Sequence, residues 1–191
     1  MNHSKNVAAL VAVWLVLVCG MYGIVVAYMS SPGESNVVTV DNHKSQSDSS
    51  VIVRIFLHPE CPCSKTSLEE LREIDFPSHI RIVAYFVVPE EYNDAWAMQD
   101  LWQLAGTVPS LERVLDHKGI ITSKYAVKTS GHVLVEKTPK SIVFSGGITI
   151  GRGHRGNNQG KTAVDKLVHG YNSHVSQTPV FGCALFATKS L

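Results

Sequence analysis

Residues 51–64 have the sequence VIVRIFLHPECPCS, and this stretch decides the fold class. Its first seven residues are apolar or β-branched except for Arg54, which predicts a buried strand. Two cysteines with Pro62 between them follow closely, and proline suits the first turn of a helix. Apolar residues recur at intervals of three within residues 62–74, so we expect a helix with one buried face there.

The rest of the chain continues this alternation of strand and helix. A turn signal at residues 137–140 predicts a hairpin between the last two strands. The order of elements predicts an α/β sandwich with a mixed central sheet. The further strands are expected at residues 80–88, 111–115, 132–135 and 141–144, and the further helices at residues 93–105, 120–125 and 158–169.

The composition is that of one globular domain with an apolar extension. The chain has 191 residues, 45% of them hydrophobic, and its 17 basic and 16 acidic side chains leave a net charge of +1. This balance, with basic residues scattered along the chain, argues against nucleic-acid binding. Four cysteines are too few for a scaffold built on disulfides, so we expect one domain with its own core, and with a C-terminal tail, over residues 51–191.

An uncharged segment of 23 residues lies near the amino terminus, at residues 7–29. At about 1.5 Å per residue a helix of this length spans a bilayer, so residues 1–30 are expected to form a membrane anchor. Lys5 precedes the span, which places the amino end in the cytoplasm. We expect a single-pass protein of the cell inner membrane, with its C-terminal domain in the periplasm or at the cell exterior. Residues 31–50, rich in Ser, Asn and Asp, are expected to be a flexible linker.

The cysteine motif and its surroundings resemble those of the thioredoxin-like superfamily. Residues 58–64 follow the first core strand and open a helix, and residues 116–127 precede a strand, a hairpin and a last helix. The combination of CPCS, SGGIT, RGHRGNNQG and TPVFGC is similar to that of a group of bacterial proteins called RedB. The resemblance covers residues 50–170 and implies a thioredoxin-like sandwich with thiol-disulfide chemistry at the cysteine motif.

Two features depart from the superfamily pattern. Only Pro62 separates Cys61 from Cys63, where the superfamily has two intervening residues. Residues 129–132 (TSGH) stand where the superfamily has a cis-proline that supports the docking of the substrate backbone. Ordinary thioredoxin reductase activity is therefore not carried over to this chain.

Cys61 is the expected nucleophile. As the cap of a helix, its sulfur would face the free backbone N–H groups and the positive end of the helix dipole, which stabilise a thiolate and lower its pKa. Cys63 is expected to resolve the mixed disulfide, because residues two apart in a turn lie within the Cα range of a disulfide and Pro62 favours that geometry. The alternative is a pair of reduced cysteines that pack as small hydrophobic side chains.

Four side chains are expected to assist the cysteines. Arg152 and His154 lie in a glycine-rich loop, residues 146–160, which should overlook the motif and place cations or backbone amides beside a thiolate. His58 and His132 flank the same end of the predicted sheet. A solvated loop without a chemical role is the alternative for residues 146–160.

Cys183 lies beyond the last helix, in a tail that is too apolar to be freely solvated. We expect this tail to dock on the domain, with Gly182 allowing a bend at the cysteine. An extended tail of this length reaches the Cys61 end of the domain. Cys183 is then a second resolving thiol or a third metal ligand, and a buried free cysteine or an intermolecular bridge is the alternative.

These residues together predict a membrane-anchored thiol-disulfide oxidoreductase that acts outside the cytoplasm. Its partners would be protein thiols or disulfides there and the membrane itself, and we expect no cofactor. The alternative function is a thioredoxin-fold copper chaperone, in which Cys61, Cys63 and Cys183 or a nearby histidine hold Cu(I) or another thiophilic metal. A redox-inactive interaction module is a third option.

The expected orientation is open to a direct test. A reporter enzyme that is active only in the periplasm, fused after Leu191, should be active in cells, because Lys5 holds the amino end in the cytoplasm. The same fusion with a reporter that is active only in the cytoplasm is the control. Activity of the cytoplasmic reporter alone would reverse the orientation.

Overall fold

The computed structural model describes residues 2–34, 50–137 and 141–186. It divides into two units, Met1–Ser31 and Pro32–Leu191, which are described separately.

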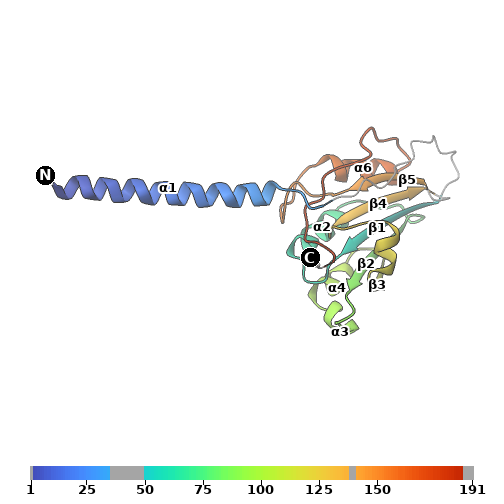
Figure 1. The fold of residues 1–191 in the computed structure, drawn as a ribbon. Coiled ribbons are helices and arrows are strands. Elements are labelled where there is room, and N and C mark those ends of the chain that lie inside the picture. The colour runs from blue at the N-terminus through green and yellow to red at the C-terminus, as the bar shows by residue number, and fades with distance from the viewer. Residues whose placement is uncertain (1, 35–49, 138–140, 187–191) are drawn as a thin grey trace. The chain divides into compact units, whose positions relative to one another are not determined.

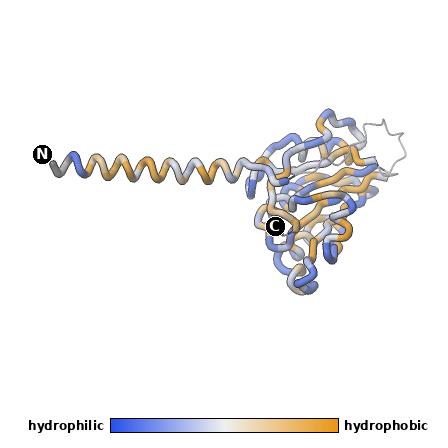
Figure 2. The backbone as a smooth tube through the Cα atoms, in the orientation of Figure 1, coloured by the Kyte–Doolittle hydropathy of each residue, from blue (hydrophilic) through white to orange (hydrophobic). Residues whose placement is uncertain are grey.

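The first unit is a single helix, α1 (Asn2–Ser30). Its segment Lys5–Ser30 is long and apolar enough to cross a membrane. Figure 2 shows apolar residues along most of this helix. The helix expected at residues 7–29 is therefore present.

The second unit is built on one five-stranded sheet with the strand order β3-β2-β1-β4-β5 (Figure 1). β1 is parallel to β2, and β2 is parallel to β3. β4 is antiparallel to both of its neighbours, β1 and β5. The sheet is mixed, as predicted. The strands are β1 (Val51–Leu57), β2 (Arg81–Val88), β3 (Leu111–His117), β4 (His132–Lys137) and β5 (Ser141–Gly146).

Alternate residues of the strands face two separate apolar clusters, because successive side chains of a strand point to opposite faces. One cluster joins the sheet to α2, α4 and α6. The other joins the opposite face to α5 and to Leu185 of the tail. The helices are α2 (Pro62–Arg72), α3 (Asp94–Ala97), α4 (Asp100–Ala105), α5 (Ile120–Lys124) and α6 (Gln159–Val168).

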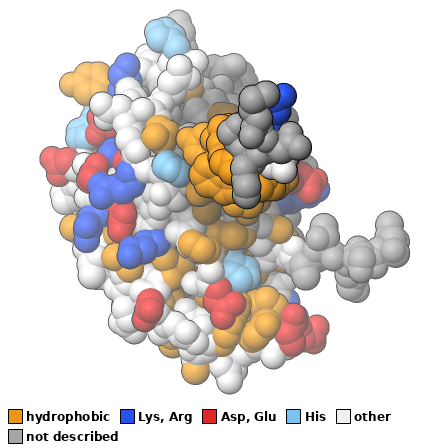
Figure 3. Space-filling view, turned by 90° about the vertical axis from the view of Figure 1, so that its left-hand side faces the viewer, with side chains coloured by type: hydrophobic (Ala, Val, Ile, Leu, Met, Phe, Trp, Pro, Cys, Tyr) orange, Lys and Arg blue, Asp and Glu red, His pale blue; other side chains and the backbone are white. Residues whose placement is uncertain are grey.

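This arrangement is the thioredoxin-like fold that the sequence resemblance implied. The first half consists of a strand, a helix that begins at the cysteine motif, and a parallel strand. An antiparallel hairpin and a final helix complete the domain. α2 follows the cysteine motif and α6 follows the hairpin, and both helices pack on the same face of the sheet. Basic and acidic side chains are intermixed on the face of the molecule in Figure 3, in line with the small net charge.

The single helix expected at residues 93–105 is wrong, because the structure has two short helices there. α3 is capped by the Asn93 side chain, which accepts from the Trp96 N–H, and Gln99 then adopts an extended backbone (φ −87°, ψ −151°) before α4 begins. The break lets Trp96 donate its ring N–H to Glu60 (2.9 Å) while Leu101 of α4 packs in the core.

The start of the predicted linker lies against the domain. The Gly33 N–H donates to the Val180 carbonyl (2.8 Å), and the Thr129 hydroxyl donates to the Glu34 carbonyl (2.6 Å). Residues 32–34 thus belong to the second unit, whereas residues 35–49 of the expected linker and residues 138–140 of the expected turn lie outside the described residues.

The C-terminal tail is docked on the domain, as expected from its apolar residues. Val180 and Leu185 are each 1% exposed, and Leu185 packs with Phe56 and Val127 in the second cluster. The tail is therefore part of the folded domain as far as residue 186.

Asp116, at the end of β3, holds the start of α5. Its carboxylate is buried and accepts from the N–H groups of Ile121 (2.8 Å) and Thr122 (2.8 Å) and from the Thr122 hydroxyl (2.6 Å). These three donors would be left without a partner in the described structure if the carboxylate were removed.

We predict that Asp116→Ala lowers the free energy of unfolding by about 2 kcal/mol, the cost of losing a helix-capping carboxylate and leaving buried donors unpaired. In the full chain in detergent this corresponds to a melting temperature lower by about 4–8 °C. Asp165→Ala, on the exposed side of α6, is the matched control and should change little. Equal melting temperatures for the two variants would contradict the assigned role of Asp116.

Candidate functional site

Cys61 lies where β1 ends and α2 begins. It precedes the first residue of the helix with an extended backbone (φ −80°, ψ 116°), and Pro62 follows as the first helical residue. The Cys61 N–H donates to the His58 carbonyl (3.1 Å), and the Ser64 N–H donates to the Cys61 carbonyl (3.0 Å). The predicted position of Cys61 at the helix start is confirmed, and its side chain is only 3% exposed.

The tail brings Cys183 to Cys61 from 122 positions away in the chain. The two sulfurs lie 2.8 Å apart, and the Cys183 backbone N–H lies 3.4 Å from the Cys61 sulfur. Both are free thiols in the structure, as is Cys63. Because an N–H can only donate, the Cys61 sulfur is the acceptor in this contact, which suits a thiolate.

Two buried serines connect the cysteine motif to the tail. The hydroxyls of Ser64 and Ser130 lie 2.6 Å apart, and the His58 N–H donates to the Ser130 hydroxyl (2.7 Å). The Ser130 N–H donates in turn to the Cys183 carbonyl (2.8 Å). Our sequence analysis missed these serines. Its only signal was the TSGH stretch in the place of the expected proline.

Hydrogen bonds make Cys61 the most acidic thiol of the site. Burial by itself would raise the pKa of Cys61, but hydrogen bonds from Cys183 and from the hydroxyl and N–H of Ser64 outweigh it and leave the pKa below its ordinary value. The predicted direction is therefore confirmed. The Ser64 N–H belongs to the helix start that the sequence analysis named, whereas the hydrogen bonds from Cys183 and from the Ser64 hydroxyl were not predicted.

The other two thiols have the opposite shift. Burial raises the pKa of Cys183 to about 12, and its hydrogen bond to Cys61 and the charge of Cys61 add to this effect. Burial and the neighbouring Cys61 also raise the pKa of Cys63, although Arg152 and the Gly153 N–H act against them. Of the three thiols, Cys61 is thus the one whose environment favours the thiolate, whereas Cys63 and Cys183 are shifted towards the thiol.

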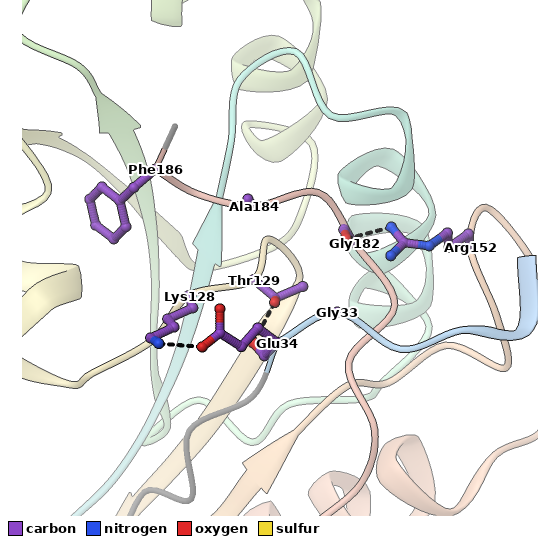
Figure 4. Close-up of a pocket in the computed structure, with 8 residues that line it drawn as sticks. All are labelled: Gly33, Glu34, Lys128, Thr129, Arg152, Gly182, Ala184 and Phe186. Atoms are coloured by element: carbon purple, nitrogen blue, oxygen red, sulfur yellow. Dashed lines mark hydrogen bonds and ion pairs between the residues drawn. The ribbon is translucent and has the colours of Figure 1, made fainter. Parts of the chain in front are cut away.

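The glycine-rich loop lies beside the cysteines, as predicted. Arg152 donates to the Gly182 carbonyl (2.5 Å), next to Cys183 in the chain, and its charge lowers the pKa of Cys63 and Cys183. The close-up in Figure 4 shows Arg152 pointing at the tail.

Ion pairs hold this loop and the start of α6 on α2. The buried Glu70 carboxylate accepts from the Gly156 N–H (2.9 Å) and from the Lys161 ammonium (2.6 Å). Arg155 and Lys161 also contact Glu73. The loop is therefore anchored, which argues against the alternative of a freely solvated segment.

The three histidines of the predicted site have different environments. His154 is exposed and its ring contacts the Arg152 carbonyl (2.7 Å), while His58 packs edge-on against Trp96. His132 is buried and its Nε2 lies 2.8 Å from the Ser145 hydroxyl. Burial lowers the pKa of His132 to about 4, so this ring is neutral at physiological pH.

The residues do not assemble into an evident metal site. Among the described ranges, no three His, Cys, Asp or Glu side chains converge in a way that could hold a metal ion. The sulfurs of Cys61 and Cys183 lie 2.8 Å apart, and two thiolates suit Cu(I) in principle.

A pocket of about 400 Å³ lies beside the thiol pair (Figure 4). Gly182 and Ala184 line it, whereas Cys183 between them approaches Cys61. The pocket therefore does not open onto the sulfurs. Its lining residues are Gly33, Glu34, Lys128, Thr129, Arg152, Gly182, Ala184 and Phe186.

Comparison with known proteins supports the fold. No family model matches the chain, and a search of curated proteins gives no match. The chain is similar to an uncharacterized conserved protein from Geobacillus kaustophilus, with 17% identity and a TM-score of 0.57 over 85% of this chain and 92% of that chain. It is also similar to a hypothetical protein from Sinorhizobium meliloti 1021, with 15% identity and a TM-score of 0.57 over 85% of this chain and 96% of that chain. The N-terminal domain of PilB from Neisseria gonorrhoeae aligns with a TM-score of 0.45 and 13% identity over 68% of this chain and 82% of that chain.

We predict that the reduced full chain in detergent shows one thiolate, detected by its ultraviolet absorbance, that forms below the ordinary cysteine pKa. Cys61→Ser should abolish this titration. Cys183→Ala should raise the pKa of Cys61, because it removes the donor that most strongly stabilises the anion. Cys19→Ser, in α1, is the control and should leave the titration unchanged. A low-pKa titration that persists in Cys61→Ser would assign the thiolate to another residue.

Proposed function

We propose that this protein exchanges thiols and disulfides through a Cys61–Cys183 couple, in a domain tethered to the membrane by α1. One observation carries the proposal. A thiol of lowered pKa lies 2.8 Å from a second thiol, with which it can form a bond without rearrangement of the fold. Catalytic dithiols need such a pair, because the thiolate is the attacking species and the second thiol resolves the intermediate.

The half-reaction balances without a cofactor. The Cys61 thiolate attacks one sulfur of a partner disulfide, the partner's S–S bond breaks, and the second partner sulfur leaves as a thiolate and takes up a proton. Cys183 then loses its proton and attacks the Cys61 sulfur, which releases the first partner sulfur and forms the Cys61–Cys183 disulfide. The partner gains two electrons and the protein loses two. The reverse reaction oxidises a partner dithiol.

The pKa values favour this order of events. Burial is the largest cause of the raised pKa of Cys183, and the hydrogen bond to Cys61 and the charge of Cys61 add to it, so Cys183 stays protonated while Cys61 is free. A mixed disulfide at Cys61 carries no charge and accepts no such hydrogen bond, so two of the causes of the raised pKa disappear. Arg152 then favours the Cys183 thiolate at the step where Cys183 must attack.

The role of Cys63 as resolving thiol stays a prediction. Cys63 is near enough to Cys61 for Cys61 to raise its pKa, and the sulfur of Cys183 lies 2.8 Å from that of Cys61. We therefore assign resolution to Cys183 and treat Cys63 as a second thiol that can exchange with the couple.

α1 and Lys5 support a location of the domain outside the cytoplasm. The domain would act in the periplasm or at the cell exterior, and an oxidising compartment there suits a dithiol couple. Its partners would be protein thiols or disulfides. Membership of the RedB group also stays a prediction, supported by the four sequence motifs that it shares with this chain.

The copper-chaperone alternative uses the same thiols. Cu(I) held by Cys61 and Cys183 would leave the protein reduced and metal-loaded after purification under a reducing atmosphere. Metal content measured on the sample used for the disulfide assay separates the two functions.

We predict that equilibration of the full chain in glutathione redox buffers, followed by alkylation and peptide mapping, gives a reversible disulfide that links the Cys61 and Cys183 peptides. Cys63→Ser should retain this link, because Cys63 is not a member of the couple. Cys183→Ser should abolish it. A disulfide between Cys61 and Cys63 in the full chain, with Cys183 free, would make Cys63 the resolving thiol, as the sequence predicted. Bound copper, with thiols that do not oxidise, would favour the chaperone.

A further inference from the structure

A series of hydrogen bonds leads to the Cys61 sulfur, and we call it the hydroxyl relay. The Ser64 hydroxyl donates to that sulfur. The hydroxyls of Ser64 and Ser130 lie 2.6 Å apart, and the His58 backbone N–H donates to the Ser130 hydroxyl (2.7 Å). Ser64 and Ser130 are each 0% exposed, so bulk water does not compete for these bonds.

The number of available hydrogens fixes the direction of the hydroxyl relay. A serine hydroxyl has one hydrogen to donate and lone pairs with which to accept. The hydrogen of Ser64 is directed at Cys61, so in the contact between the two hydroxyls Ser130 is the donor. The Ser130 oxygen accepts from the His58 N–H, which can only donate. Every hydrogen of the relay therefore points towards the Cys61 sulfur.

The opposite direction would form one hydrogen bond fewer. If the Ser64 hydroxyl donated to Ser130, the Cys61 sulfur would lose a donor and the Ser130 hydrogen would need another acceptor. Within the part of the chain that the structure describes, the Ser130 hydroxyl has no acceptor other than Ser64. A buried hydrogen without an acceptor costs free energy, so the direction towards Cys61 is the stable one while Cys61 is an anion.

We propose that Ser130 is a positioning residue that acts on the Cys61 thiolate through Ser64. Because the Ser130 hydroxyl donates to the Ser64 oxygen, the hydrogen of Ser64 is left for the Cys61 sulfur. A hydroxyl that accepts a hydrogen bond is also a stronger donor, because bonds in series polarise one another. The His58 N–H begins this effect from the backbone just after β1.

The use of the hydroxyl relay rests on the proposed function, in which Cys61 alternates between thiolate and disulfide. The anion forms again whenever an S–S bond to Cys61 breaks and Cys61 leaves as a thiolate. The Ser64 hydroxyl is already aimed at the sulfur, so the charge that develops there is stabilised without movement of the backbone. Both serines keep their protons, and the relay takes no part in the balance of electrons.

Ser130 also holds Cys183, but with its backbone. The Ser130 N–H donates to the Cys183 carbonyl (2.8 Å). Ser130→Ala removes the hydroxyl and retains this N–H. The variant therefore separates the effect of Ser130 on Cys61 from the placement of Cys183.

The test measures the ultraviolet absorbance of the Cys61 thiolate against pH in the reduced full chain in detergent. Ser64→Ala should lower the acid dissociation constant of Cys61 about tenfold, as expected for a lost hydrogen bond to a charged group, and Ser130→Ala about threefold, because its effect is indirect. In the Ser64→Ala protein, Ser130→Ala should cause no further change. Ser67→Ala is the matched control, because Ser67 is a buried serine of α2 whose hydroxyl donates to the Cys63 carbonyl (3.3 Å), and it should leave the titration unchanged.

Three results of this titration would overturn the proposal. An unchanged constant in Ser130→Ala would show that the Ser130 hydroxyl does not act on Cys61. An effect of Ser130→Ala that persists in the Ser64→Ala protein would show that it does not act through Ser64. An equal effect of Ser67→Ala would reduce the result to a general change in the packing of α2.

The rate of alkylation of Cys61, followed by peptide mapping, separates positioning from structural damage. Below the midpoint of the titration Ser130→Ala should react about twofold more slowly, because less thiolate is present. Above the midpoint it should react slightly faster, because a less acidic thiol gives a more nucleophilic thiolate. A Cys61 that the substitution had merely exposed would react faster at every pH, which would contradict the positioning role.

The His58 amide proton provides a measurement that needs no change at position 130, should Ser130→Ala fail to fold. Its chemical shift in the otherwise unmodified chain should follow the titration of Cys61, and Ser64→Ala should remove this response. A response of equal size in Ser64→Ala would come directly from the charge of Cys61 and would overturn the relay. Failure of the proposed function is distinguishable, because these titrations would then behave as expected while glutathione buffers gave no disulfide between Cys61 and Cys183.

Discussion

The contact between the sulfurs of Cys61 and Cys183 is the interaction on which the chemistry of this domain depends. Burial raises the pKa of Cys183 and the contact adds to this, while the hydrogen bond from Cys183 lowers the pKa of Cys61, so the two thiols differ in acidity as the proposed exchange requires. The contact exists only because the tail adds a short strand beside residues 128–130 and buries Leu185. The backbone pairing of the tail with residues 128–130 thereby affects the acidity of the Cys61 thiol, which lies near the start of the domain sequence.

The rest of the domain holds Cys61 and Cys183 in place. β1 and α2 fix Cys61 through the turn that ends at Ser64, and the buried Ser64–Ser130 contact ties that turn to the segment on which the tail lies. The ion pairs of Glu70 attach the glycine-rich loop to α2, which brings Arg152 to the Gly182 carbonyl. Charges that look dispersed in the sequence therefore serve to position the tail.

Local patterns predicted the fold and the position of Cys61 at the start of α2. The run at residues 51–57 gave β1 at the bounds observed, and proline after Cys61 marked the start of α2. The break between α3 and α4 escaped prediction because no glycine or proline marks it, since the residue with the extended backbone is Gln99. The sulfur contact was predicted only as one option, since chain length shows that Cys183 can reach Cys61 but not which backbone groups hold it there. Ser130 carried no signal of its own, because a serine in a loop is compatible with many environments.

The central claim is that Cys61 and Cys183 form the redox couple while Cys63 stays reduced. The most direct measurement is the ¹³Cβ chemical shift of each cysteine in the full chain, recorded in the reduced and oxidised states. The account predicts that the resonances of Cys61 and Cys183 move together to the values of a disulfide and that the Cys63 resonance keeps the value of a thiol. Joint movement of Cys61 and Cys63, with Cys183 unchanged, would contradict it.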